Sequence, residues 1–143
     1  MYWRGGVWLP MAYLGTKALD RYGFHEIAAT NAENLLKDMV KTYNEHEPHT
    51  IWEVYSPTEP KPATYKRNKE MFRPNFCGWS ALAPISMFIE DILGFHDVDA
   101  INKVISWRLY RDVPHGIRRF RFGSIITDIL YESNEGTPTT YLL

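Results

Sequence analysis

Residues 78–94 read GWSALAPISMFIEDILG, and this stretch separates two kinds of sequence. Its apolar residues cover most of the faces that a helix of this length would present, which predicts a helix buried on more than one side. Before it, apolar residues recur at helical spacing. After it, they occur in short aromatic and β-branched runs. Helices and strands are therefore segregated along the chain, which predicts an α+β fold instead of alternating βαβ units.

Two helical patterns precede this stretch. Between residues 8 and 22 the apolar side chains recur at the helical period, and Pro10 falls in the first turn, where a helix tolerates proline. A second pattern covers residues 26–45, with charged side chains opposite an apolar stripe. Gly23 between them is typical of a helix stop, so we expect an antiparallel helical hairpin.

A long loop is expected between this hairpin and the third helix. Residues 48–77 contain five prolines, and only residues 50–55 favour an extended conformation. Loops of this length are usually functional or disordered.

The strands are expected in the last third of the chain. Three runs, separated by turn residues, predict three strands, and TPTTYLL at the end predicts a possible fourth. The adjacent arginines Arg118, Arg119 and Arg121 are expected to face solvent. We therefore predict about three helices in residues 1–97 and a small antiparallel β segment in residues 98–143. The runs are KVISWRLY (103–110), GIRRFRFG (116–123) and SIITDILYE (124–132).

Composition excludes several classes of protein. Sixteen Lys and Arg balance seventeen Asp and Glu, so no net field would attract nucleic acid or an anionic membrane, and we expect neither as a partner. The single cysteine, Cys77, excludes an intrachain disulfide. His46 and His49 are the only histidines with a paired spacing, and they fall at a predicted helix end, so we expect no metal and no cofactor. No apolar run approaches the ~20 residues of a membrane span, and no compartment is assigned.

The segment TIWEVYSP (50–57) places a carboxylate between aromatic rings. Rings stack on the apolar faces of sugars, and an apolar wall tunes the acidity of a neighbouring carboxyl group. Glu53 is thus a candidate catalytic residue, with Trp52 and Tyr55 as candidate substrate-binding residues. The alternative is a solvated glutamate in a short strand.

Two further aromatic segments are open to two interpretations each. YWRGGVW (2–8) is either part of a binding pocket or a core-filling cluster in which Arg4 pairs with a carboxylate. FCGWS (76–80) is either a pocket segment or only the entry turn of the third helix.

Taken in order, three of these segments resemble the end of the (α/α)6 barrel of glycoside hydrolase family 63. That family includes processing α-glucosidase I and mannosylglycerate hydrolase-like enzymes, and its barrel is similar to those of trehalases and glycogen-debranching enzymes. The family patterns Tyr-Trp-Arg-Gly-Pro-x-Trp and Trp-Glu-x-Tyr-x-Pro match nearly position for position. Gly6 replaces the usual proline, but glycine also permits a tight turn. The resemblance covers about residues 2–94 and rests on YWRGGVW (2–8), WEVYSP (52–57) and GWS (78–80).

The resemblance implies that the helices of residues 1–97 are part of an (α/α)6 toroid, and it implies roles for individual residues. Glu53 corresponds to the general base that activates water in an inverting hydrolysis. Trp3 and Arg4 correspond to residues that line the sugar pocket, and Trp79 corresponds to a tryptophan beside it. Each of these roles is carried over by position in the matching motif.

The general acid of such a mechanism is expected elsewhere. An inverting enzyme needs an acid about 6.5–9.5 Å from the base. The resemblance places it on an aspartate upstream of the Tyr-Trp-Arg-Gly segment, and the present sequence starts at that segment. We therefore expect a catalytically incomplete chain: a truncated reading frame, an excised fragment or one part of a split protein.

Other classes of function remain open. A carbohydrate-binding module without catalysis would use Trp3, Trp52 and Trp79 as a stacking platform. A structural or interaction protein would bind no sugar, and its aromatic residues would all be buried. Incomplete coverage of the helices would leave apolar surface on a monomer, so we also expect a homodimer or higher oligomer.

Overall fold

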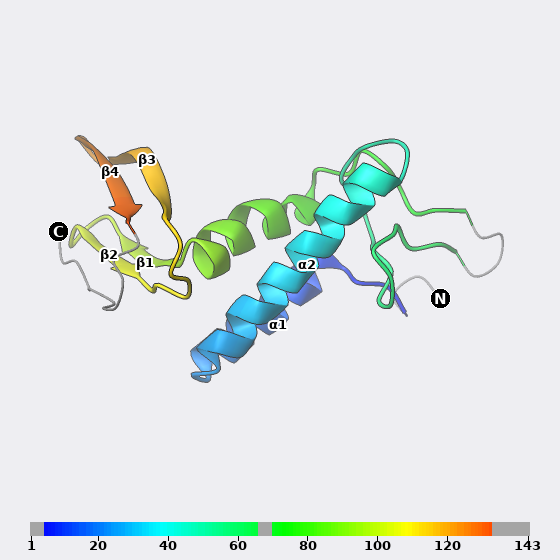
Figure 1. Cartoon of the computed structure of the whole chain (residues 1–143), viewed down its shortest axis with the longest axis horizontal. Helices are drawn as coiled ribbons and strands as arrows, with labels where there is room; N and C mark the ends of the chain where they lie inside the picture. The colour runs from blue at the N-terminus through cyan, green and yellow to red at the C-terminus, as the bar shows by residue number, and fades with distance from the viewer. Residues whose placement is uncertain (1–4, 66–69, 133–143) are drawn as a thin grey trace. The chain divides into compact units, whose positions relative to one another are not determined.

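The computed structural model describes residues 5–65 and 70–132. The chain forms two compact units, residues 1–88 and 89–143, which are considered separately below. The first unit contains the helical hairpin and the long loop, and the second contains four strands in two hairpins (Figure 1). Helices followed by small antiparallel sheets confirm the predicted α+β class. The division at residue 97 stays a prediction, because compact units are not the same as domains that fold alone.

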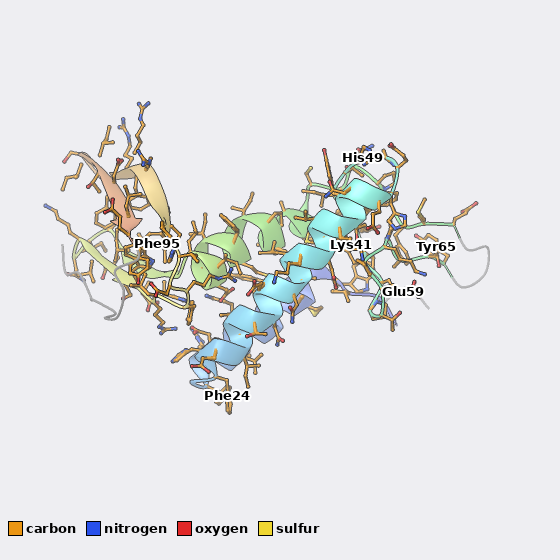
Figure 2. The ribbon with its side chains drawn as sticks, in the orientation of Figure 1. Phe24, Lys41, His49, Glu59, Tyr65 and Phe95 are labelled. Atoms are coloured by element: carbon orange, nitrogen blue, oxygen red, sulfur yellow. The ribbon has the colours of Figure 1, made fainter. Side chains whose placement is uncertain are left out.

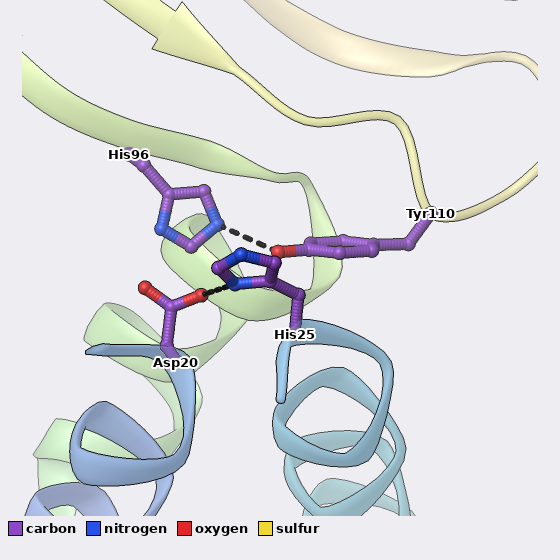
Figure 3. A network of polar contacts seen from close by, with 4 residues as sticks. All are labelled: Asp20, His25, His96 and Tyr110. Atoms are coloured by element: carbon purple, nitrogen blue, oxygen red, sulfur yellow. Dashed lines mark hydrogen bonds and ion pairs between the residues drawn. The ribbon is translucent and has the colours of Figure 1, made fainter. Parts of the chain in front are cut away.

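The helical hairpin of the first unit forms as predicted. Helix α1 (Leu9–Arg21) and helix α2 (His25–Glu45) lie side by side and are joined by a tight turn (Figure 1). Gly23 turns the chain with φ of +85°, a conformation that favours glycine. The hairpin is closed by Asp20 Oδ1 and His25 Nδ1, which are 2.7 Å apart (Figure 3).

Small side chains on α2 form most of its buried stripe. Ala28, Ala29 and Ala32 are buried together with Met39, and they recur at helical spacing. Phe24, at the tip of the hairpin, is half exposed (Figure 2). The hairpin therefore has one covered face and a partly uncovered apolar surface.

The predicted third helix is divided into two parts. A short 3₁₀ turn, η1 (Trp79–Ala81), precedes η2 (Ala83–Ile92), whose turns are wider than those of an α-helix and follow the i→i+5 pattern. Pro84, which has no N–H to donate, stands at the start of η2. Ala83 and Met87 are buried, whereas Ile85 is more than half exposed.

The second unit contains four strands where the sequence runs predict three within the described residues. β1 (Phe95–Asp99) pairs with β2 (Val104–Trp107), and β3 (His115–Phe122) pairs with β4 (Ile125–Tyr131), both antiparallel. The runs at 103–110, 116–123 and 124–132 are confirmed as strands. β1 escapes the pattern because its sequence, FHDVD, carries two aspartates, which are rare in strands. The fourth strand expected at residues 137–143 lies outside the described residues.

Side-chain contacts within the second unit hold the β1–β2 hairpin. Phe95 stacks on Trp107 with ring centroids 4.8 Å apart, and the Tyr110 hydroxyl lies 3.2 Å from His96 Nε2 (Figure 3). Asp99 accepts hydrogen bonds from the backbone and side chain of Asn102, and these bonds lower the pKa of the Asp99 carboxyl group. The turn between β1 and β2 is thereby fixed by the side chain of the last residue of β1, Asp99.

The adjacent arginines of β3 face solvent, as expected. A bulge lies between Ile117 and Phe120, so the regular alternation of strand faces is interrupted there. Arg119 has φ of +55°, within the left-handed region, and donates its backbone N–H to Asp128 Oδ1 on β4 at 2.7 Å. The bulge explains how the neighbours Arg118 and Arg119 are both exposed.

Candidate functional site

The first two sequence segments are paired through their backbones. Val7 donates its N–H to the Tyr55 carbonyl at 2.8 Å, and Tyr55 donates its own N–H to the Val7 carbonyl at 3.1 Å. These reciprocal bonds form an isolated antiparallel bridge between residues far apart in the sequence. The segment 5–8 is therefore held directly beside the segment that carries Glu53.

Close packing at this bridge explains Gly6. A Cβ atom added there would lie 2.4 Å from Cγ1 of Val54, which is closer than real Cβ contacts allow. Val54 is itself fully buried and cannot move aside freely. Alanine or proline would introduce this Cβ, so the glycine is required by space as well as compatible with a turn.

The third segment reaches Glu53 through a serine. Glu53 is 2% exposed, and it donates its backbone N–H to the Arg73 carbonyl at 2.9 Å. Its carbonyl accepts a hydrogen bond from the Ser80 hydroxyl at 3.3 Å. The Glu53 N–H is thus bonded to the end of the loop and its carbonyl to the turn after the loop, and the GWS segment meets the WEVYSP segment at this residue.

Aromatic rings pack around the same junction. Trp8 lies in a buried cluster with Val54, Ala63 and Phe72, and its ring meets the Phe72 ring edge-on at 5.9 Å. The Trp79 ring lies 6.4 Å from that of Trp8. Apolar burial therefore joins the three segments in addition to their hydrogen bonds.

Trp79 is the exposed aromatic residue of this junction. Its side chain is 42% exposed, and its ring centroid lies 5.1 Å from that of Phe76. Farther along the loop, Tyr65 stacks on Phe72 at 4.1 Å (Figure 2 labels Tyr65). A sugar ring could stack on the free part of Trp79 without disturbing the buried cluster.

Trp52 and Tyr55 both point into the protein. Trp52 is 1% exposed, and its backbone N–H donates to the Tyr55 hydroxyl at 3.1 Å. Burial raises the pKa of Tyr55 above its ordinary value of 10.0, and the bond from Trp52 opposes this rise only partly. The indole N–H of Trp52 is buried and meets no hydrogen-bond acceptor among residues 5–65 and 70–132.

The structure thus brings together four of the six predicted site residues. Glu53, Trp52 and Tyr55 are buried, and Trp79 lies at the exposed edge of the same cluster. Trp3 and Arg4 lie outside the described residues. The roles assigned to all six stay predictions.

Ser80 and Arg73 contribute contacts that the motif comparison does not assign. Ser80 belongs to the recognised GWS segment, so its position next to Trp79 offers a signal that could have drawn attention to it. Arg73 contributes only its backbone carbonyl, and no sequence pattern marks such a contact.

Within the part of the chain that the structure describes, no group of three or more His, Cys, Asp or Glu side chains could hold a metal ion. Among those same residues, no helix is both long enough and apolar enough to span a bilayer.

The buried glutamate and the exposed tryptophan both lie in the part of the chain that a glycoside hydrolase family model matches. The family model of the mannosylglycerate hydrolase MGH1-like glycoside hydrolase domain matches residues 1–79. The match covers more than half of the chain, and the chain belongs to this family. It includes the first two sequence segments and ends at Trp79. No curated protein and no solved structure matches the chain.

Proposed function

We propose that this chain supplies the general-base side and part of the sugar pocket of an inverting α-glycosidase. Glu53 would take a proton from the water that attacks the anomeric carbon. Trp3, Arg4 and Trp79 would line the pocket. The observation that supports this most is that hydrogen bonds join all three motif segments: Val7 pairs with Tyr55, and Ser80 bonds to the carbonyl of Glu53.

A fixed backbone suits a general base. Proton transfer requires the carboxylate to lie within hydrogen-bond reach of the attacking water in a defined orientation. Bonds to Arg73 and Ser80 hold the Glu53 peptide from both sides, and Val54 beside it is fully buried. Such support reduces the reorganisation needed at the moment of reaction.

The proposal assigns no general acid within these 143 residues. The family resemblance places the acid before the Tyr-Trp-Arg-Gly segment, which begins here at Tyr2. Loss of one acid or base group typically removes about 10²–10⁴-fold of the rate. We therefore propose that the chain alone does not hydrolyse glycosides at a meaningful rate.

Product release tests this part of the proposal. Purified protein would be incubated with α-glucosides, α-mannosides and mannosylglycerate, and free glucose or mannose would be measured. The expected result is no release above the buffer control, in wild type and in Glu53→Gln alike. Turnover that Glu53→Gln abolishes would show that the chain is catalytically complete.

A second candidate function is sugar binding without any catalytic role for Glu53. The exposed ring of Trp79 beside Phe76 favours this alternative, because stacking on an aromatic face is the usual way to hold a sugar. Calorimetry with Trp79→Ala and Glu53→Gln separates the two functions. Both variants should weaken binding if Glu53 faces the sugar, whereas only Trp79→Ala should do so in a simple binding module. Tyr43→Ala, at a half-exposed tyrosine of α2, is the control.

We also propose that the chain self-associates. Met11, Leu14 and Tyr22 follow one another at spacings of three and eight residues, which places them on one side of α1 and its end, and each is more than half exposed. Neither Leu14 nor Gly15 is charged, and Ala18 lies on the same face of α1. A second copy of the chain would cover this surface.

A further inference from the structure

Two bonds that hold the Glu53 segment come from side-chain hydroxyl groups. The Tyr55 hydroxyl accepts the N–H of Trp52, and the Ser80 hydroxyl donates to the carbonyl of Glu53 itself. The bonds from the Glu53 N–H to Arg73 and between Val7 and Tyr55 join backbone to backbone, so no side-chain substitution removes them directly. Ser80 is consequently a side chain that can be changed to test how the Glu53 carbonyl is held.

The Ser80 hydroxyl is directed away from its own helix. Serine in a helix commonly bonds to a nearby backbone group of the same segment. Ser80 instead bonds to a residue 27 positions earlier, and its side chain is fully buried. The turn that carries it is closed separately, because the Ala81 N–H donates to the Gly78 carbonyl at 3.2 Å.

The same turn carries the exposed ring of Trp79. Trp79 and Ser80 are consecutive residues of η1, and one is exposed while the other is buried. The bond from Ser80 to Glu53 therefore fixes the turn that presents Trp79 relative to the segment that presents the carboxylate.

We propose that Ser80 is a positioning residue that sets Glu53 relative to the sugar-stacking ring of Trp79. The inference rests on the proposed function, because it assumes that Glu53 and Trp79 face the same sugar. The hydroxyl holds the carbonyl of Glu53 and so limits rotation of the peptide next to the Glu53 Cα atom. A peptide whose rotation is limited fixes the direction of the Cα–Cβ bond of Glu53. The direction of the carboxylate then depends on that bond.

Carbon-13 NMR of the Glu53 carboxyl group tests this role. The resonance is assigned by its loss in Glu53→Gln and is then compared in Ser80→Ala, Ser80→Cys and Ser80→Thr. Cysteine keeps a group of similar size that donates weakly, and threonine keeps the hydroxyl. Ser56→Ala is the matched control, because the Ser56 hydroxyl is paired with Thr58 and not with Glu53.

The expected result is a shift of the Glu53 resonance by more than its line width in the alanine and cysteine variants. The threonine variant should restore the wild-type position, and Ser56→Ala should leave it unchanged. An unchanged resonance in folded Ser80→Ala and Ser80→Cys would overturn the proposal, as would a threonine variant shifted as far as alanine. If Ser80→Ala alone fails to fold, the contrast between cysteine and threonine decides. Loss of folding in both would assign the hydroxyl to the fold as a whole and reject a positioning role.

A sugar titration of the wild-type chain separates this inference from the proposed function. Methyl α-mannoside and methyl α-glucoside serve as probes, with the Trp79 indole signal as the readout. Absence of binding together with an intact Ser80 effect would reject the sugar site and leave the support of Glu53 by Ser80 standing. Binding without any Ser80 effect would reject only the positioning role.

Discussion

At the residue scale, the junction around Glu53 depends on one small and one hydroxylated side chain. Gly6 leaves room for Val54, and the Tyr55 hydroxyl satisfies the N–H of Trp52. Neither feature involves a charged contact, yet each is required for the segments to approach as closely as they do. Substitution of either residue should therefore destabilise the chain.

Gly6→Ala should destabilise the chain, because its Cβ would lie 2.4 Å from Cγ1 of Val54. Overpacking of this kind typically costs about 1–3 kcal/mol. Val54→Ala in the same chain removes the obstructing methyl groups, so the double variant should lose less stability than the sum of the single variants. Urea unfolding of all four proteins measures this coupling, expected at about 0.5–3 kcal/mol. Strict additivity would mean that the two side chains do not compete for space.

Tyr55→Phe should destabilise the chain by about 1–3 kcal/mol, since the buried N–H of Trp52 would lose its acceptor. Tyr43→Phe, at a half-exposed tyrosine of α2, should have little effect on the free energy of unfolding. Denaturant titration at neutral pH compares the two variants.

The same tyrosine predicts a loss of stability at alkaline pH. Its pKa is raised in the folded state, so the unfolded chain releases the phenol proton first, starting near pH 10.0. The favourable contribution is complete below that pH and is lost as pH rises from there to the folded pKa. Tyr55→Phe should therefore show a shallower fall in unfolding free energy above pH 10.0 than wild type. Parallel curves for the two proteins would contradict burial of the phenol.

At the element scale, local periodicity predicts the helices well and the strands less completely. The hairpin of α1 and α2 follows the expected pattern within one residue at its beginnings and ends. The wide turns of η2 and the strand β1 could not be predicted in the same way. Tertiary pairing forms β1, because Phe95 stacks on Trp107 although the strand's own sequence is poor in strand-forming residues.

The candidate site, like the helices and strands, could be predicted from the sequence only in part. The resemblance selects Glu53 and Trp79, and the structure brings both to one junction. The resemblance could not indicate that Arg73 supplies a backbone carbonyl, because a backbone contact does not depend on the type of residue that makes it. Nor could the resemblance indicate that the Trp52 side chain points into the protein, because the sequence is the same whichever way this side chain points.

The β1–β2 hairpin should depend on Gly94. An added Cβ would lie 1.8 Å from the carbonyl oxygen of Arg108, a backbone atom that cannot be displaced without moving β2. Gly123 also has a positive φ, but an added Cβ there would have no atom within 4 Å. Gly123→Ala should therefore cost only the conformational strain of about 1–2 kcal/mol, and Gly94→Ala should cost clearly more.

Thermal unfolding followed by the near-ultraviolet signal of the aromatic residues, which include Trp107, compares these two glycine variants. Equal shifts in midpoint would show that space at Gly94 is not the limiting factor.

At the scale of the whole molecule, uncovered apolar side chains on α1 predict association. Light scattering at micromolar concentration should give a mass of at least two chains. Leu14→Asp should shift the population toward the monomer, because it places a charge in the proposed interface. Asn44→Asp, at an exposed position of α2, is the control for one added negative charge. A monomer for wild type would contradict the proposed self-association.

The central claim is that Glu53 and Trp79 face one sugar. The most direct test is an NMR titration of the wild-type chain with mannosylglycerate, following the Glu53 carboxyl carbon and the Trp79 indole N–H together. Both signals should move with the same saturation curve, and Trp79→Ala should remove the response at Glu53. A titration in which neither signal moves, or in which only signals distant from this junction do, would contradict the claim.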